Sequence, residues 1–240
     1  GDFTSTRTSV RNVANSIISA SLRGLFVETT YYYASFTEVG GVYVFSSVKS
    51  FTTEAIPEGA VELGLSVLWA SCNVGAKSPE EYGDHFAWGE TEAKSDYSPS
   101  TSVTYNVDVS ELKSQGVIGS NGLITSAYDA ATVIWGGDWR MPTLDESAEL
   151  LNNCTWEWTS VNGVNGQKVT GPNGNSIFLP AAGYRYDEVV KNSGSHGCYW
   201  SATCYKYYSY NAYSFYFDAS LHDWYYFYRF HGRTIRPVTE

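Results

Sequence analysis

The chain has 240 residues and a formal net charge of −10, and its Lys and Arg residues form no cluster. That charge balance argues against nucleic acid and anionic membrane surfaces as partners, because both are bound by concentrated positive charge. With 43% hydrophobic and 16% aromatic residues it can bury a core, unlike disordered chains. No run reaches the roughly 18 apolar residues of a membrane helix, and the polar opening Gly1-Asp2-Phe3 predicts no signal peptide.

The first 53 residues are predicted to form a small β module. "SIISASLRGL" alternates Ile18, Ala20 and Leu22 with a period of two, which is typical of a strand. "YYYASFTEVGGVYVFSSVKSFTT" has β-branched and aromatic runs on both sides of Gly40-Gly41, which indicates a hairpin turn. Because a complete sandwich takes about 100 residues, we expect a small or truncated module over residues 1–53. Residues 54–60, "EAIPEGA", are predicted to be a linker.

Residues 61–240 are predicted to form a second, larger domain with few helices. In "MPTLDESAELLNN", Thr143 precedes Glu146 by three residues, which is the spacing of a capping box at a helix start. Shorter helices are predicted in "AYDAATVIWG" and "VSELKSQGVI". Nearly all the rest is strand and loop interrupted by Gly and Asn, with "GPNGNS" as a turn. The predicted class is therefore α+β and β-rich.

Four segments of this domain carry a resemblance to a known family: "VELGLSVLWASCNVGAKSPEEYGDHFAWGETEAKSDYS", "WGGDWRMPTLDESAELLNNCTWEWTSVNGVNGQKVTGPNGNSIFLPAAGYRY", "YWSAT" and "GRTIRPV". Over residues 61–240 the chain resembles surface proteins of gut Bacteroidetes with a C-type-lectin domain of the formylglycine-generating-enzyme type. Some of these are variable proteins of diversity-generating retroelements, whose ligand-binding face is mutated by reverse transcription. Residues 25–53 resemble the closing strands of a fibronectin-type-III-like module.

The resemblance implies a secreted or cell-surface protein, lipid-anchored before trimming in some forms. Its expected partner is a protein or glycan on another cell, a phage or a host surface, without insertion of this chain into a membrane. In such a domain "GDHFAWGET" is framework, so Trp88 is expected in the core and Glu90 as an acceptor that holds a loop. In "GRTIRPV", Ile235 and Val238 are expected in the core, with Arg236 paired to a buried acceptor.

A tyrosine-rich stretch near the C-terminus is the candidate binding surface. Residues 199–231 hold 10 of the 20 Tyr and contain no Glu, Gln, Met, Pro, Ile or Val. The absence of Ile and Val argues against an ordinary β core, and the mixture of Tyr with Ser, Asn, Asp and His is typical of antibody paratopes. The alternative is an aromatic core with ordinary loops. In "AYSFYFD", alternation predicts Tyr213, Phe215 and Phe217 inward and Ser214, Tyr216 and Asp218 outward.

Trp200 is expected to be framework, and Trp224 is a second candidate for the framework. The remaining polar and aromatic positions give the predicted ligand contacts, which are Tyr205, Tyr207, Tyr208, Tyr210, Tyr216, Leu221, His222, Asp223, Tyr225, Tyr226, Tyr228, Phe230 and His231.

Two further groups of residues are candidates for catalysis. Asp84, His85 and Glu90 lie close in sequence and could run acid–base catalysis, although the framework role is favoured. Cys198 and Cys204 could be the reactive pair of the oxidase branch of the fold, a disulfide, or two free thiols. The chain has no CxxC, no His pair at metal-ligand spacing and no Glu-Pro-Asn or Gln-Pro-Asp calcium signature. We therefore predict no cofactor and no metal.

Three functions follow from these observations. The favoured one is a non-enzymatic ligand-binding protein. The second is a structural or adhesive subunit of a surface assembly, such as a pilus tip, in which residues 1–53 would dock a neighbour by strand addition. The third is an oxidase of the formylglycine-generating type that uses Cys198 and Cys204.

Overall fold

The computed structural model describes residues 29–53 and 55–240. The chain divides into two compact units, one ending at Ile56 and the other beginning at Pro57. The division lies inside the stretch predicted as a linker, although Ala60 already belongs to a strand of the second unit. The strand predicted around Ile18–Leu22 lies outside the described residues.

The described part of the first unit is a long β hairpin with an irregular middle. β1 (Thr30–Tyr33) pairs antiparallel with β4 (Lys49–Thr52), and β2 (Phe36–Val39) pairs with β3 (Val42–Phe45). Gly40 and Gly41 join β2 to β3 at φ +61° and +81°. Two consecutive residues with positive φ match the twist of the flanking strands, and glycine adopts this conformation without a steric cost. The predicted hairpin turn is confirmed.

The second unit has three short α-helices, each where the sequence predicted one. α1 spans Val109–Ser114, α2 spans Ala130–Trp135 and α3 spans Leu144–Asn153, and a 3₁₀ turn covers Pro99–Thr101. At the start of α3 the Thr143 hydroxyl accepts from the Glu146 backbone N–H at 3.2 Å. The Glu146 carboxylate accepts from the Thr143 N–H at 2.8 Å, so the capping box is complete. No helix in the described part of the chain combines the length and the apolarity that crossing a membrane requires.

Two antiparallel sheets of this unit are built from strands that are consecutive in the chain. β7 (Thr155–Val161), β8 (Val164–Thr170) and β9 (Ser176–Pro180) make a meander. Pro172 lies at the first central position of the turn between β8 and β9, where Gly174 N–H donates to the Gly171 carbonyl at 3.0 Å. β10 (Tyr184–Tyr186) and β11 (Val189–Lys191) form a separate two-stranded ribbon.

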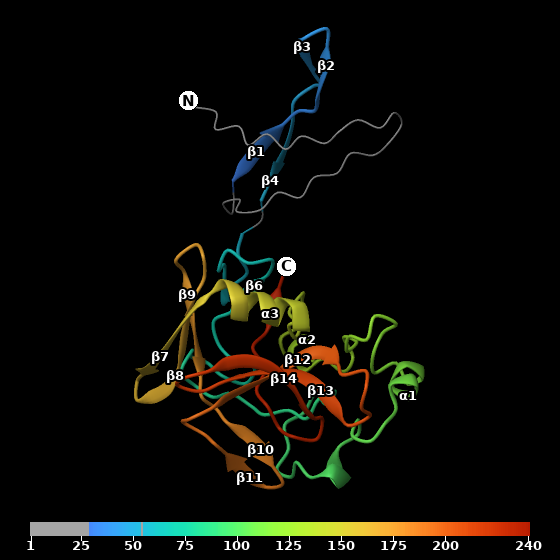
Figure 1. Ribbon diagram of the computed structural model, residues 1–240, viewed down its shortest axis with the longest axis vertical. Coiled ribbons are helices and arrows are strands. Elements are labelled where there is room, and N and C mark those ends of the chain that lie inside the picture. Colours follow the sequence, from blue (N-terminus) through green and yellow to red (C-terminus); the bar gives the residue numbers. More distant parts are fainter. Residues whose placement is uncertain (1–28, 54) are drawn as a thin grey trace. The chain divides into compact units, whose positions relative to one another are not determined.

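The central sheet carries the candidate surface. It has the order β12 (Gly197–Cys204), β13 (Asn211–Phe217), β14 (His222–Tyr228), with both pairs antiparallel. α3 contacts all three strands (Figure 1). The chain closes through β15 (Val238–Thr239), which pairs with β6 (Leu68–Ala70), and β6 also pairs with β5 (Ala60–Val61). The two ends of the second unit therefore meet in one small sheet.

Hydrophobic clusters lie on both sides of the central sheet. One contains Trp88, Leu112 and Trp200, and the other contains Trp69, Leu150 and Phe215. Gly197 permits the second cluster to pack tightly, because a Cβ at this position would lie 2.0 Å from the Phe217 ring. The unit is β-rich with few helices, in agreement with the predicted class.

Three arginines are fully buried in this core without an acidic partner in the described chain: Arg229, Arg233 and Arg236. Arg236 donates to Asn73 Oδ1 at 2.8 Å, to the Ala70 carbonyl at 3.0 Å and to the Phe178 carbonyl at 2.9 Å. The predicted pairing of Arg236 is confirmed, as is the burial of Ile235 and Val238.

Candidate ligand-binding surface

A cluster of stacked aromatic rings covers the loop between β12 and β13 and the neighbouring part of β14. The Tyr205 ring lies 4.1 Å from the Tyr226 ring, with 22° between the ring planes, and Tyr226 stacks on Tyr225 at 4.5 Å. We call this cluster the tyrosine surface and define it as Tyr205, Tyr207, Tyr208, Tyr213, Trp224, Tyr225 and Tyr226.

Tyr205 is the centre of the tyrosine surface. Its ring contacts those of Tyr207, Tyr208 and Tyr213 at 5.2 to 5.7 Å, in addition to Tyr226. These separations are those of favourable ring pairs, so the rings hold one another in place. Because these side chains are already held in place, they lose little conformational entropy when they contact a ligand.

Hydrogen bonds fix the loop that carries three of these rings. Tyr205 N–H donates to the Asn211 carbonyl, and Asn211 N–H donates to the Tyr208 carbonyl, both at 3.4 Å. The Ser209 hydroxyl bonds Asp108 Oδ1 at 3.2 Å, which ties the loop to the residue before α1. The loop is thus closed on itself and attached to the body of the domain.

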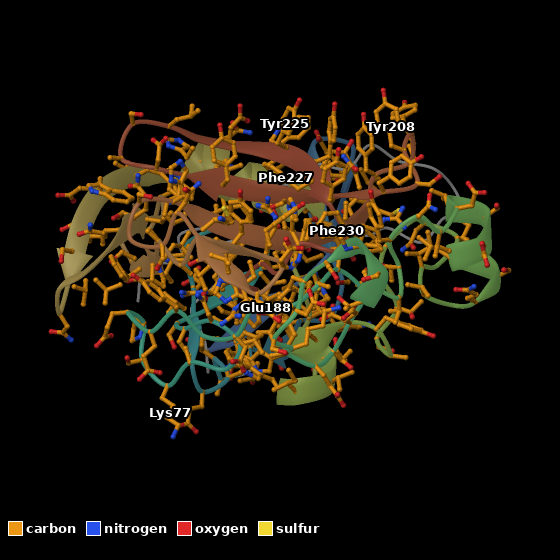
Figure 2. All side chains as sticks on the ribbon, turned by 90° about the horizontal axis from the view of Figure 1, so that it is seen from below. Lys77, Glu188, Tyr208, Tyr225, Phe227 and Phe230 are labelled. Carbon is orange, nitrogen blue, oxygen red and sulfur yellow. The ribbon has the colours of Figure 1, made fainter. Side chains whose placement is uncertain are left out.

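The outer rings are freely accessible. Tyr207, Tyr208 and Tyr225 are 68%, 54% and 50% exposed. Figure 2 shows Tyr208 and Tyr225 at the margin of the molecule, while Phe227 and Phe230 lie deeper. Among the other predicted contacts, the exposed ones are Tyr210, Leu221, His222, Asp223 and Tyr228, and the half-buried ones are Tyr205, Tyr216 and Tyr226.

Two predicted contacts are wrong, because Phe230 and His231 are buried, with 3% and 9% of their surfaces exposed. Phe230 packs edge-on against Tyr105 at 4.8 Å and stacks on Tyr228 at 5.5 Å. The chain turns inward after β14, where His231 N–H donates to the Tyr228 carbonyl. Both side chains are therefore the floor of a second aromatic cluster, whose outer members are Tyr105, Tyr184, Tyr186, Tyr210 and Tyr228.

The assignment of faces on β13 is partly wrong. Phe215 and Phe217 are in the core as predicted, but Tyr213 is only half buried and belongs to the tyrosine surface. Ser214, predicted outward, is buried and donates to the Tyr199 carbonyl at 2.7 Å. The reason is that both faces of β13 are covered along part of its length, so strict alternation fails there.

The two tryptophans differ in role. Trp200 is framework as predicted, since it is buried and its Nε1 donates to the Phe86 carbonyl at 2.8 Å. Trp224, the other framework candidate, is 43% exposed and packs edge-on against Tyr213. Trp224 and Tyr213 are therefore surface residues that were not among the predicted contacts. The spacing of Trp224 two residues before Tyr226 on β14 places both on one face of the strand and indicates this position.

Charge is sparse and mostly negative around these rings. Lys206 is the cation of the loop and lies over the Tyr207 ring at 5.0 Å. On the other side, burial raises the pKa of Tyr216, and the negative charges of Asp223 and Asp218 raise it further. The hydrogen bond and charge of Tyr225 raise the pKa of Tyr226 to about 12. The hydroxyls of Tyr216 and Tyr226 therefore stay protonated at neutral pH.

In the acidic segment before residue 97, Trp88 lies in the core and Glu90 holds a loop, as predicted. Trp88 is buried, and its Nε1 donates to the Ser201 carbonyl at 2.8 Å. Glu90 accepts from the Val103 N–H at 3.1 Å and pairs with Lys94 at 2.6 Å. His85 lines an open cavity of about 440 Å³. Burial, with the charge of Arg185, lowers the pKa of His85 to about 4, so its imidazole is neutral at pH 7.

The cysteines are free thiols. Cys198 and Cys204 belong to the same strand, β12, and both are buried. Burial raises the pKa of each thiol, and the charges of Arg233 and Arg229 only partly oppose this effect. A thiol with a raised pKa is a poor nucleophile at neutral pH. The described residues contain no group of three or more His, Cys, Asp or Glu that could hold a metal ion.

Comparison with known proteins finds similarity to a family model. A family model described as a domain of unknown function (DUF8237) matches residues 156–238. No curated protein and no solved structure matches the chain. The matched segment runs from β7 to the start of β15, so it contains the whole central sheet and all seven members of the tyrosine surface.

Proposed function

We propose that this chain is a non-enzymatic ligand-binding protein, secreted or displayed at a cell surface, that recognises a protein or glycan through its tyrosine surface. The observation that carries the proposal is the contiguous cluster of rings centred on Tyr205, whose outer members Tyr207, Tyr208 and Tyr225 are exposed. A cluster of exposed rings on a folded unit costs hydration free energy and is typical of interaction sites. Tyrosine is enriched where a few residues carry most of a binding energy.

The C-type-lectin fold of the formylglycine-generating-enzyme type is our proposal for residues 61–240. Its support is the placement of the motif residues. Trp88, Trp200 and Arg236 come from three separate segments that resemble the family, and all three are buried and hydrogen-bonded to backbone carbonyls. Diversification of the tyrosine surface by a retroelement is part of the same proposal. A repeat beside a reverse-transcriptase gene that differs only at adenines would test it.

A structural or adhesive role is the second candidate, and the first unit favours it. In its hairpin Val39, Val42 and Phe45 are all more than 60% exposed. Size-exclusion chromatography of the whole chain tests this role, because docking of neighbours through the hairpin predicts concentration-dependent oligomers. A monomer at all concentrations contradicts it. The raised thiol pKa values of Cys198 and Cys204 argue against the oxidase alternative.

Replacing Tyr208 and Tyr225 together by Ala tests the favoured function. Binding partners are first sought for the whole wild-type chain on an immobilised glycan array and in a phage-displayed library of random linear peptides. The double variant is expected to bind the selected ligands at least about 100-fold more weakly, since two accessible aromatic contacts are lost. Its melting temperature should change by less than about 2 °C, because neither ring is in the core.

Tyr32→Ala is the matched control, since Tyr32 is 72% exposed and lies in the first unit. Its affinity should equal that of the wild type. Equal binding by the wild type and the double variant contradicts the proposal, and so does the absence of any saturable ligand in both libraries.

A further inference from the structure

β14 is the outer strand of the central sheet, and no strand in the described chain covers its far edge. The sheet order is β12-β13-β14, so β14 pairs with β13 on one side alone. The opposite edge, that of β12, is closed by bridges from Tyr199 to Thr234 and from Gly183 to Gly197. An open edge presents unpaired N–H and C=O groups that can pair with another chain.

The register shows which backbone groups of β14 face outward. Arg229 N–H donates to the Tyr210 carbonyl, and Asp218 N–H donates to the Leu221 carbonyl. Hydrogen-bonded and non-hydrogen-bonded pairs alternate along an antiparallel ladder. Asp223, Tyr225 and Phe227 therefore bond to β13, while the N–H and C=O groups of His222, Trp224, Tyr226 and Tyr228 point away from it.

Most of these outward groups lack partners within residues 29–53 and 55–240. The Tyr228 carbonyl accepts from His231 N–H, and the Trp224 N–H donates to Asp223 Oδ1 at 2.7 Å. The N–H groups of His222 and Tyr226 and the carbonyls of His222, Trp224 and Tyr226 have no hydrogen bond from the described residues. The side chains from His222 to Tyr225 are all exposed, although α3 contacts β14 and the His222 ring stacks on Trp156 at 4.7 Å.

The charge and the rings along this edge indicate the chemistry of its occupant. β14 has one acidic residue, Asp223, and no Lys or Arg. Asp223 faces Tyr216 across the ladder, and Asp218 also acts on that tyrosine. Trp224, Tyr225 and Tyr226 offer ring faces to cations on either side of the edge. An extended polypeptide presents its own N–H and C=O groups at the repeat of a strand and can pair with the whole row, whereas a glycan has no backbone with this repeat.

We propose that an extended segment of a protein partner, bearing Lys or Arg, adds to β14 as a fourth strand of the central sheet. Its backbone pairs with the outward groups of His222 and Tyr226 and with the Trp224 carbonyl, and its basic side chain pairs with Asp223. Asp223 has a second effect in the free protein: by occupying the Trp224 N–H it blunts the edge against indiscriminate pairing. The proposal rests on the proposed function and names the class of partner.

The test separates the backbone of Tyr226 from its ring. Peptides are selected for the whole chain from a library of random linear 12-residue peptides, and their affinities are measured for Tyr226→Ala and Tyr226→Pro. Alanine removes the ring and keeps the outward N–H, while proline removes both. An edge strand tolerates proline at a position where the N–H faces outward. Selected peptides should contain Lys or Arg and bind the proline variant about tenfold more weakly than the alanine variant.

Amide hydrogen exchange on the wild-type chain gives a reading that does not depend on folding of the variants. In the free protein the amides of His222 and Tyr226 should exchange quickly and those of Tyr225 and Phe227 slowly. A saturating peptide should slow exchange at Tyr226 at least about tenfold. In addition, Asp223→Asn should lower the affinity for basic peptides about threefold and leave the affinity for neutral peptides unchanged.

The outcomes distinguish this proposal from the proposed function. If peptides bind but proline equals alanine and Tyr226 gains no protection, the added strand is refuted while the tyrosine surface remains a binding site. The same conclusion follows if only glycans bind and the Tyr208→Ala/Tyr225→Ala variant loses them. If neither library yields a ligand, both proposals fail.

Discussion

At the scale of single residues, Arg236 is a buried cation stabilised entirely by uncharged acceptors. Its three hydrogen bonds reach Ala70 and Asn73 in one segment and Phe178 in β9. Burial lowers the pKa of Arg236, but a guanidinium remains charged in proteins. The planar fork of donors fits acceptors in several directions at once, which a lysine ammonium on a single stem does not.

Arg236→Met should lower the free energy of unfolding by about 3 kcal/mol, because three buried acceptors lose their donor. Arg236→Lys should recover less than half of this loss. Urea unfolding of both variants measures the effect, with Lys191→Met as the exposed control, expected within about 0.5 kcal/mol of the wild type. A loss below about 1 kcal/mol for Arg236→Met contradicts the assigned role.

At the scale of elements, α3 depends on its first turn. The helix contacts all three strands of the central sheet, and its capping box satisfies N–H groups that have no partner within the helix. Thr143→Ala should therefore cost about 1 kcal/mol in the free energy of unfolding. Thr143→Ser, which keeps the accepting oxygen, should cost far less. Equal urea midpoints for the alanine variant and the wild type contradict this account.

The helix starts and turns could be predicted because their causes are local in sequence. The capping box at Thr143, the Gly40-Gly41 turn and the Pro172 turn each need only neighbouring residues. The faces of β13 could be predicted only in part. Its alternation placed Phe215 correctly and Ser214 wrongly, because hydrophobic clusters lie on both sides of this strand.

The candidate site shows the same limit. The Tyr-rich composition indicated which segment carries the tyrosine surface, since composition describes a whole segment and not single positions. It could not show that Phe230 and His231 are buried, because the rings that cover them include Tyr105 and Tyr186, which are distant in sequence. Which rings in an aromatic segment are outside depends on packing between segments, and no local pattern contains that information.

At the scale of the whole molecule, two buried histidines couple stability to pH. Burial lowers the pKa of His85 to about 4, with the Arg185 charge contributing, and lowers that of His231 to about 3. An unfolded histidine titrates near pH 6.5. Below that pH the unfolded chain binds protons that the folded chain does not. Titration of these two histidines therefore leaves the free energy of unfolding unchanged above about pH 6.5. It lowers that free energy as the pH falls from there toward the folded pKa values.

The melting temperature should accordingly decrease from pH 7 to pH 5, a range in which most carboxylates do not yet titrate. His231→Phe should reduce this decrease, because phenylalanine fits among the same rings and has no proton to bind. The variant should also be more stable at pH 7, since neither ring nitrogen of His231 has a hydrogen-bond partner in the described chain. A pH profile identical to that of the wild type contradicts this prediction.

The carbonyl-bound arginines have a consequence for how this domain can evolve. Arg229 donates to the main-chain carbonyls of Asn211, Thr104 and Val107, and Arg236 to those of Ala70 and Phe178. Every amino acid supplies a carbonyl, so these anchors are indifferent to the side chain at the accepting position. Asn211 is the first residue of β13, which follows the loop that carries Tyr205, Tyr207 and Tyr208. Substitutions in that loop can therefore leave these anchors intact, which gives the scaffold mutational robustness beside the tyrosine surface.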